Sequence, residues 1–310
     1  MSGGTWQFVL VGLGIGILVG MTGMGGGSLM TPILILLFGF DPGKAVGTDL
    51  VHGAVFKSFG AVRARRLGTV HARLALWMFC GSAPLSLVGN WVGHQLGQHS
   101  TDLQARVVGW ALIVGGLGFL GKTFVARGIQ ASDAPFVLAR RDKVIALMLG
   151  AAGGFIVGMT SVGSGTFFAL VMLFVYPLTA AKLVGTDIFH AAILLWVAGA
   201  SSIIHGDVVW HAFAWMLVGS IPGILVGARL PLVIPDRVLR VAFGAVLILS
   251  GTKLTEAMSK TATNWTIAVG LGIFAAGMLA WAVLHRARLL ERRRVEAEGA
   301  PVLAGPDPAA

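Results

Sequence analysis

The sequence predicts an all-α polytopic membrane protein made of two inverted-topology repeats, each with a pair of short helices broken by glycines. Three observations support this fold class. The chain is 56% hydrophobic and only 12% charged, with a mean hydropathy of +0.85, which is typical of a protein that crosses a membrane several times. A glycine-rich motif occurs twice, and the lysines and arginines gather in a few short loops and the C-terminal tail.

The first copy of the motif reads GMTGMGGGS and covers residues 20–28. The apolar runs 6–19 and 29–40 flank it, and each is shorter than the about 20 residues that a membrane-spanning helix needs. Glycine costs roughly 1 kcal/mol relative to alanine inside a helix, so this motif predicts a break between two short helices. We expect the backbone N–H groups and hydroxyls at the break to face a small anion. Close helix packing through small residues is the alternative.

The second copy, GMTSVGSGT at 158–166, lies 158 − 20 = 138 residues later. At this shift roughly 25 of the 78 positions from Gly12 to Gly89 are identical. KAVGTD at 44–49 matches KLVGTD at 182–187, and GSxP at 81–84 matches GSxP at 219–222. Glycine-interrupted short segments at matching places in two halves are a sequence pointer to the binding site of a transporter.

Hydropathy and the repeat together divide the chain. A first membrane repeat covers 6–125, a cytoplasmic linker 126–142, a second membrane repeat 143–256, an additional transmembrane helix 265–285 and a disordered basic tail 286–310. The expected membrane segments are 6–19, 29–40, 45–62, 71–93, 104–125, 143–157, 167–178, 183–204, 208–231, 236–256 and 265–285. Whether each short pair is re-entrant or consists of two thin spans is left open.

The distribution of basic residues predicts the orientation. The loops 63–73 and 229–240, the linker and the tail carry most of the lysines and arginines, so we place them in the cytoplasm and the N-terminus outside. Gly68 and Gly206 are then equivalent but on opposite sides, so the halves are inverted about an axis in the membrane plane. Lys253 and Lys260 fall on the outer side and do not fit this scheme. The net charge of +10 therefore indicates membrane flanks, not nucleic-acid binding.

Ionisable residues recur at matching places in the two halves. Thr48-Asp49 and Thr186-Asp187 are expected to open the helix that follows each short pair, either as stabilisers of the helix start or as walls of the binding cavity. A histidine follows each aspartate by three residues and shares its helical face. Ionisable groups inside a membrane suggest a pathway or a relay. The candidate substrate-binding residues are Thr22, Gly23, Gly25, Gly26, Gly27, Ser28, Thr48, Asp49, His52, Thr160, Ser161, Gly163, Ser164, Gly165, Thr166, Thr186, Asp187 and His190.

Other readings of the polar residues are weaker. Lys57 matches Leu195 in the second half, and we expect its side chain to extend toward the basic loop 63–66. Ser164 with His190 or His205 suggests a serine hydrolase pair, but Ser164 matches Gly26, so the repeat argues against it. Two Asp-x-x-His pairs are a weak metal signal. Cys80 is the only cysteine, which excludes an intramolecular disulfide. We expect no enzyme activity, catalytic residue, metal or cofactor.

These motifs resemble the TauE/SafE family of sulfite and organosulfonate exporters, also called the toluene sulfonate uptake permease family. The resemblance covers about residues 7–255 and rests on GMTGMGGGSLMTP at 20–32, AVGTDL at 45–50, RLGTV at 66–70 and GSAP at 81–84. The second loop is less typical, because Ser161, Ser164 and Thr166 stand where the first has Gly23, Gly26 and Ser28. The resemblance implies a bacterial inner-membrane carrier of sulfite, sulfoacetate or related C2–C3 sulfonates.

We therefore expect a secondary transporter that exports a small anion by alternating access, at a site near the bilayer midplane between the two repeats. A passive anion channel and a non-transporting membrane sensor or scaffold are the alternatives. The expected partners are a small anionic solute, sulfite or a sulfonate, and the lipid bilayer; an oligomer is compatible with the sequence. The chain lacks a GxxxxGK[ST] motif, so direct ATP drive is not expected.

Overall fold

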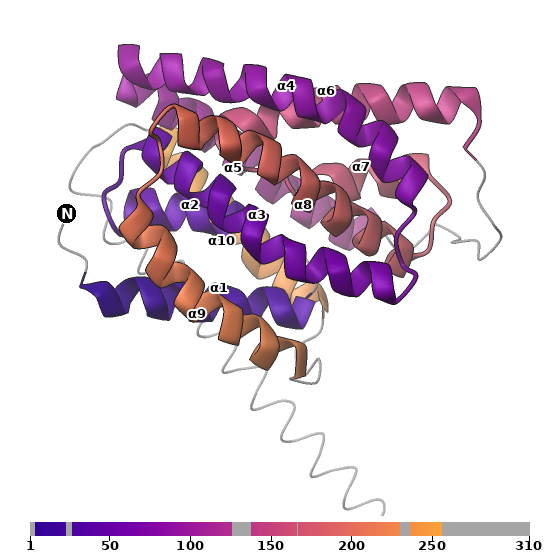
Figure 1. The fold of residues 1–310 in the computed structure, drawn as a ribbon, viewed down its shortest axis with the longest axis horizontal. Coiled ribbons are helices and arrows are strands. Elements are labelled where there is room, and N and C mark those ends of the chain that lie inside the picture. Colours follow the sequence, from indigo (N-terminus) through magenta and orange to yellow (C-terminus); the bar gives the residue numbers. More distant parts are fainter. Residues whose placement is uncertain (1–3, 23–26, 126–137, 166, 230–235, 256–310) are drawn as a thin grey trace, which may run out of the picture. The chain divides into compact units, whose positions relative to one another are not determined.

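The computed structural model describes residues 4–22, 27–125, 138–165, 167–229 and 236–255 (Figure 1). These residues form the helices α1 (Thr5–Thr22), α2 (Gly27–Leu36), α3 (Pro42–Arg66), α4 (Ala72–His99), α5 (Thr101–Val125), α6 (Arg140–Thr160), α7 (Phe167–Val175), α8 (Ala180–Ile204), α9 (Trp210–Arg229) and α10 (Asp236–Thr255). The expected helix 265–285 and the expected disordered tail 286–310 lie outside the described residues, as does most of the linker 126–142.

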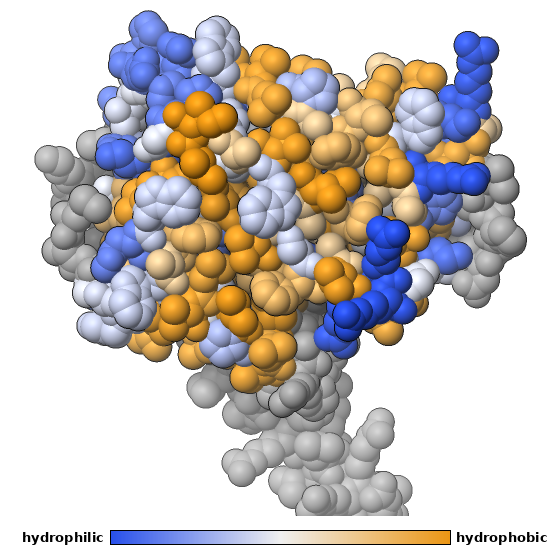
Figure 2. All heavy atoms as spheres, in the orientation of Figure 1, coloured by the Kyte–Doolittle hydropathy of each residue, from blue (hydrophilic) through white to orange (hydrophobic). Residues whose placement is uncertain are grey.

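The described helices are those of a polytopic membrane protein. Five of them contain a stretch long and apolar enough to cross a membrane, namely Ala72–His99, Thr101–Leu120, Arg140–Thr160, Ala181–Ile204 and Trp210–Gly227. Large apolar side chains face outward, including Trp6, Trp110 and Ile204. Figure 2 shows hydrophobic residues over most of one face, with hydrophilic residues mainly toward the ends of the helices. The predicted all-α membrane class is confirmed.

The first helix of each half packs against a helix of the other half. Helix α1 packs along α9, and the matching helix α6 packs along α4. A Cβ atom on Gly12 would overlap the carbonyl oxygen of Met216, and one on Gly150 would overlap the carbonyl oxygen of Met78. Both residues of the second contact are related to the first by the 138-residue shift. The two interfaces are therefore close backbone contacts of the same kind, made possible by small residues.

Equivalent helices of the two halves run antiparallel to each other. Gly53 on α3 faces Leu195 on α8, while Gly60 faces Ile188, so residue numbers rise along α3 as they fall along α8. Helices α5 and α10 are also antiparallel, because Gly109 lies against Gly251 and Gly116 against Gly244. A two-fold axis perpendicular to the helices produces such pairs. The inverted orientation of the halves across a bilayer stays a prediction.

Each short pair is a hairpin that returns to the end at which it starts. Phe8 near the start of α1 stacks on Phe38 beyond the end of α2, with ring centroids 4.5 Å apart. In the second half, the Tyr176 hydroxyl after α7 donates to the carbonyl oxygen of Asp142 in the first turn of α6, at 2.9 Å. The expectation of a short first helix is wrong for α6, which is long enough to cross a membrane, whereas α1 is only slightly longer than expected. Helix α1 has 18 residues and α6 has 21, because both continue through the Gly-Met-Thr part of the motif.

The basic segments on either side of α4 and α6 lie at the same end of the helices. Gly81 faces Leu147 and Gly89 faces Phe155, so α4 and α6 run parallel and start at one end. Helix α3 ends there with Arg63, Arg65 and Arg66 in its last turn, and α6 starts there with Arg140, Arg141 and Lys143. The Lys143 ammonium lies 5.8 Å from the ring centre of Trp77 near the start of α4. This end therefore concentrates positive charge.

The close contact between α1 and α9 predicts a position-specific effect of alanine. Gly12→Ala would push α1 away from Met216, and we expect it to destabilise the fold by about 1–3 kcal/mol. Gly14→Ala, two residues along the same helix, meets open space and should be neutral or stabilising by about 0.4–1 kcal/mol. Thermal unfolding of both variants in one detergent measures the difference. Equal stability of the two variants would contradict the backbone contact.

Candidate functional site

Buried polar side chains lie along the contact between α3 and α8, and the loop 161–165 between α6 and α7 joins them. Ionisable groups inside a membrane are costly, and by default they mark functional positions. We call this group the core cluster; it consists of Thr31, Asp49, His52, Lys57, Ser82, Ser161, Ser164, Asp187, His190 and Ser220, each at most 3% exposed. The cluster draws on α2, α3, α4, α8, α9 and the second glycine loop.

Lys57 supplies the positive charge of the core cluster. Its Nζ donates to the carbonyl oxygen of Ser164 at 2.6 Å and to Ser164 Oγ at 2.8 Å, and the side chain is 3% exposed. The expectation that Lys57 extends toward the loop 63–66 is therefore wrong. The break after α6 offers a carbonyl and a hydroxyl as acceptors, which a lipid-facing helix surface does not. A lone ionisable residue in an apolar run is the signal that identifies Lys57 in the sequence.

Asp49 is a buried carboxylate that accepts hydrogen bonds from hydroxyl groups on two other elements. Thr31 Oγ1 on α2 donates to Asp49 Oδ2 at 2.6 Å, and Ser161 Oγ donates to the same oxygen at 2.9 Å. Asp49 Oδ1 has no hydrogen-bond partner among the residues that the structure describes. Thr31 was not among the candidates, and its match in the second half is Ala169, so the repeat gave no signal for it. Lys57 is close enough for its charge to interact with the carboxylates of both Asp187 and Asp49.

The two histidines make matching contacts across the halves. His52 Nε2 on α3 lies 3.0 Å from Ser220 Oγ on α9, and His190 Nε2 on α8 lies 2.9 Å from Ser82 Oγ on α4. The 138-residue shift relates one pair to the other, so the exchange of helices that builds the fold also pairs these side chains. The duplicated GSxP motif is the sequence signal for both serines. Within the described part of the chain, His190 Nδ1 is buried and has no hydrogen-bond partner.

Thr48 and Thr186 do not open their helices. Helix α3 begins at Pro42 and α8 at Ala180, so both threonines lie inside a helix and contribute no helix start to the site. Each hydroxyl accepts a backbone N–H from the other half at 2.9 Å, Thr48 from Val209 and Thr186 from His71. These contacts tie α3 and α8 to the starts of α9 and α4. The threonines therefore join the two halves, while Asp49 and Asp187 in the following positions turn inward to the core cluster.

The second glycine loop has an unusual backbone. Ser161 ends α6 in the left-handed conformation at φ 58°, and Gly163 and Gly165 have φ of 104° and 119°, values that side-chain-bearing residues rarely adopt. Positive φ thus alternates along the loop. Such alternation turns successive N–H groups toward one side and forms the concave anion sites known as nests. Thr160, the last residue of α6, hydrogen-bonds within its helix, to the Ile156 carbonyl at 2.7 Å.

The first glycine loop cannot be compared in the same way. Gly23, Gly25, Gly26 and Thr166 lie outside the described residues. Thr22, Gly27 and Ser28 belong to helix ends, but the placement of their side chains is not described. The structure therefore brings Ser161, Ser164, Asp187 and His190 into one buried cluster with Asp49, His52 and Lys57. The contribution of the first loop stays a prediction.

The serine hydrolase alternative does not fit this geometry. Ser164 Oγ bonds to Lys57, whereas His190 pairs with Ser82 and His205 Nδ1 with the Ser201 carbonyl at 2.8 Å. Neither histidine is placed to activate Ser164. Across the described residues, no three His, Cys, Asp or Glu side chains come together as metal ligands.

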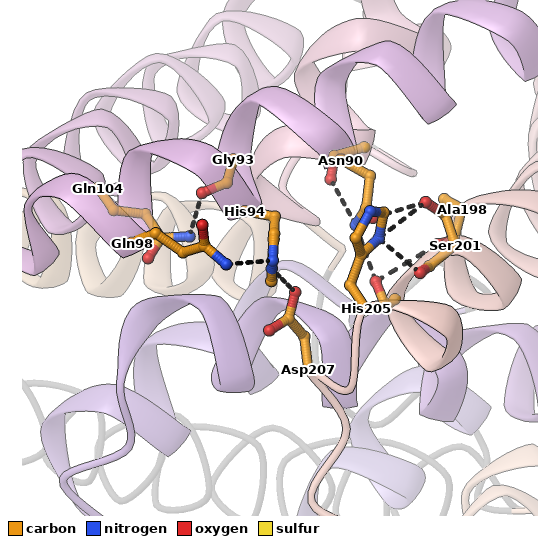
Figure 3. Close-up of polar contacts among 11 residues, drawn as sticks. Asn90, Gly93, His94, Gln98, Gln104, Ala198, Ser201, His205 and Asp207 are labelled. Carbon is orange, nitrogen blue, oxygen red and sulfur yellow. Dashed lines mark hydrogen bonds and ion pairs between the residues drawn. The ribbon is translucent and has the colours of Figure 1, made fainter.

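A second polar cluster occupies the end of the helices opposite the arginines (Figure 3). His94 Nδ1 near the end of α4 lies 2.8 Å from Asp207 Oδ2 in the turn before α9, and the rings of His94 and His205 are 4.6 Å apart. Asn90 Oδ1 accepts from Ser201 Oγ at 2.8 Å. The positions that match His205 and Asp207 are Leu67 and Thr69, so this cluster exists in one half only. The repeat comparison could not find it.

Comparison with known proteins places this architecture. Residues 8–254 match the family model described as sulfite exporter TauE/SafE. The chain is 34% identical over 251 residues to the probable membrane transporter protein YjnA of Bacillus subtilis (strain 168), covering 80% of this chain and 98% of the relative. It is 26% identical over 247 residues to the probable membrane transporter protein YdhB of the same organism, covering 79% and 98%. No solved structure matches the chain significantly.

The match spans both repeats, both hairpins and the contact of α3 with α8, so the whole described membrane region is shared with the family. The relatives are named as membrane transporters, which agrees with apolar helices that enclose a polar core. The chain therefore belongs to the TauE/SafE sulfite exporter family and is a multi-pass membrane transporter.

Proposed function

We propose that this transporter exports a small anion, sulfite or a small organosulfonate, by alternating access, and that Lys57 is the counter-charge of its binding site. The observation that carries the proposal is the placement of a buried ammonium beside the second glycine loop, near the middle of α3. The family name supports sulfite or a related sulfur oxyanion as the solute. This assignment places the site within the core cluster and gives the anion a fixed positive charge, which the sequence had not suggested.

Electrostatics favours an anion beside Lys57. Removing an ammonium from water costs several kcal/mol, and the cost is offset only by good partners. Ser164 provides two acceptors, and an ammonium has three N–H donors. An oxyanion bound there would receive the third N–H, the Ser164 hydroxyl and the loop N–H groups. At membrane depth such contacts replace the hydration that the anion loses.

Transport requires that both sides of the membrane reach this site in turn. Helices α3 and α8 pack against each other at the site, and each is tied to the opposite half through Thr48 and Thr186. A rocking movement of one half against the other would therefore open either end of their contact. With the cytoplasm negative, a monovalent anion leaving the cell gains about 2.3 kcal/mol per 100 mV, which is sufficient to drive export.

The proposed location is a bacterial inner membrane, with the N-terminus outside and the C-terminus in the cytoplasm. The gathering of Arg63, Arg65 and Arg66 with Arg140, Arg141 and Lys143 at one end supports this orientation through the positive-inside rule. The opposite end carries Asp102, Asp207 and His94.

Replacing Lys57 tests the anion site. We expect Lys57→Met to weaken binding of sulfite by about 2–5 kcal/mol, roughly 30-fold or more, because the anion loses its counter-charge. Lys57→Arg, which keeps the charge, should bind more tightly than Lys57→Met. Thermal-shift titration of purified protein with sulfite, sulfate, sulfoacetate, thiosulfate, acetate and phosphate gives both affinity and solute class. Sulfite affinity in a folded Lys57→Met variant equal to that of the wild type would exclude this site.

Flux measurements distinguish a carrier from a passive channel and from a non-transporting sensor or scaffold. Proteoliposomes loaded with unlabelled sulfite should accelerate uptake of labelled sulfite, because a carrier returns faster when it is loaded on the trans side. A channel shows flux without this acceleration, and a sensor or scaffold shows no flux. Either result would contradict alternating access.

Cysteine labelling tests the orientation. In a Cys80→Ala background, Ser132→Cys in the linker and His99→Cys at the opposite end of α4 should react with impermeant maleimides from opposite sides of the membrane. We expect His99→Cys to be labelled in intact cells and Ser132→Cys only after the membrane is opened. Reaction of both from one side would refute the inverted arrangement.

A further inference from the structure

We propose that the second glycine loop couples anion binding at Lys57 to the binding of one proton by Asp49, so that each ligand tightens the binding of the other. This inference rests on the anion site proposed above. It concerns a carboxyl oxygen, Asp49 Oδ1, that is buried and has no hydrogen-bond partner within the described residues.

The loop contacts both sites with residues three positions apart. Ser161 Oγ donates to Asp49 Oδ2 at 2.9 Å, and Ser164 accepts both hydrogen bonds of Lys57. An anion that accepts the third N–H of Lys57, the Ser164 hydroxyl and the loop N–H groups makes new contacts with the loop and shifts it. Since Ser161 is held in the left-handed conformation at the end of α6, a shift of the loop also moves its hydroxyl relative to Asp49. Loss of that donor weakens the stabilisation of the ionised carboxylate and favours its protonation.

Charge balance points in the same direction. The buried charged side chains that the structure describes are Asp49, Asp187 and Lys57, so two carboxylates face one ammonium. An added anion increases the negative charge of this poorly solvated core, and Coulomb repulsion there is only weakly screened. A proton on one carboxylate relieves the repulsion. Linkage then requires that protonation also tightens anion binding by the same factor.

Asp49 is the carboxylate whose surroundings suit proton exchange. Its Oδ2 holds both hydroxyl contacts, so a proton can bind Oδ1 without displacing Thr31 or Ser161. At the 138-residue shift these two hydroxyls match Ala169 and Gly23, neither of which carries a hydroxyl, so this pair of donors is not duplicated at Asp187. A hydroxyl pair on one oxygen and a second oxygen without a partner among the described residues make Asp49 a suitable proton site.

Other titratable groups face Asp49 and must be separated from it. His52 and Lys57 lie on the same helix, and Asp187 and His190 are buried on α8, farther along the α3–α8 contact. The His94–Asp207 pair lies at the end of the helices, where the Asp207 carbonyl contacts Gly47. Elements α2, α9 and the loop contribute the hydroxyls of Thr31, Ser220 and Ser161 among the described residues.

The test measures anion affinity as a function of pH with sulfoacetate, which stays fully ionised between about pH 6 and 8.5. The wild-type dissociation constant for sulfoacetate should rise by about tenfold per pH unit above the transition, the slope for one linked proton. Asp49→Asn should bind sulfoacetate with a flat pH profile. Asp187→Asn, His190→Gln and Asp207→Asn should keep a pH-dependent profile.

Thr31→Val and Ser161→Ala supply a readout that does not depend on the stability of Asp49→Asn. Each removes a hydroxyl that favours the ionised carboxylate, so the transition should move to higher pH in both variants. Ser161→Ala also removes the contact that moves with the loop, so the pH dependence of its affinity should be weaker than that of Thr31→Val. A flat wild-type profile, or a flat profile in His190→Gln or Asp187→Asn with the slope kept in Asp49→Asn, would overturn the coupling and leave the anion site intact. Absence of sulfoacetate and sulfite binding at every pH would instead refute the anion site on which the coupling depends.

Discussion

Backbone contact between helices of different halves is the constraint on which the rest of this structure depends. The first helix of each half, α1 or α6, lies against the fourth helix of the other, α9 or α4, at glycines that leave no room for a side chain. Apolar side chains alone give little driving force for association inside lipid, so close packing of small residues must hold these pairs. The exchange leaves α3 and α8 to pack against each other in antiparallel orientation, and the polar residues of both halves lie along that contact.

The contacts that join the two halves occur twice, but the polar residues around Lys57 and Asp49 do not. The contacts of Thr48 and Thr186 with the opposite half, and the His–Ser pairs, occur twice at the same spacing. Lys57 and the hydroxyls of Thr31 and Ser161 occur once, and all three act around the second glycine loop. Contacts that hold two related halves together are expected to obey their symmetry. A binding site on the axis between the halves would hold only one ligand. The residues of such a site therefore do not need to follow the two-fold symmetry.

The same distinction explains what could be predicted from the sequence. Hydropathy and the 138-residue repeat were sufficient for the membrane class and for the duplicated aspartates and histidines, because these features repeat. They did not reveal that α1 and α6 continue through the Gly-Met-Thr part of the motif, since a glycine lowers helix stability but packing against α9 or α4 restores it. Lys57 was misassigned because its partner, Ser164, lies 107 residues away, in a loop that folds back between the helices.

The position of the single lysine has a physical reason in the contact between α3 and α8. The residue that matches Lys57 is Leu195, which is buried on α8 against Gly53. A lysine there would place a second ammonium in the same core, close to the axis, where repulsion between like charges is only weakly screened. The two aspartates avoid this conflict. Since Gly60 faces Ile188, about twelve residues of α3, roughly 18 Å, separate the levels of Asp49 and Asp187. One ammonium between two distant carboxylates interacts with both.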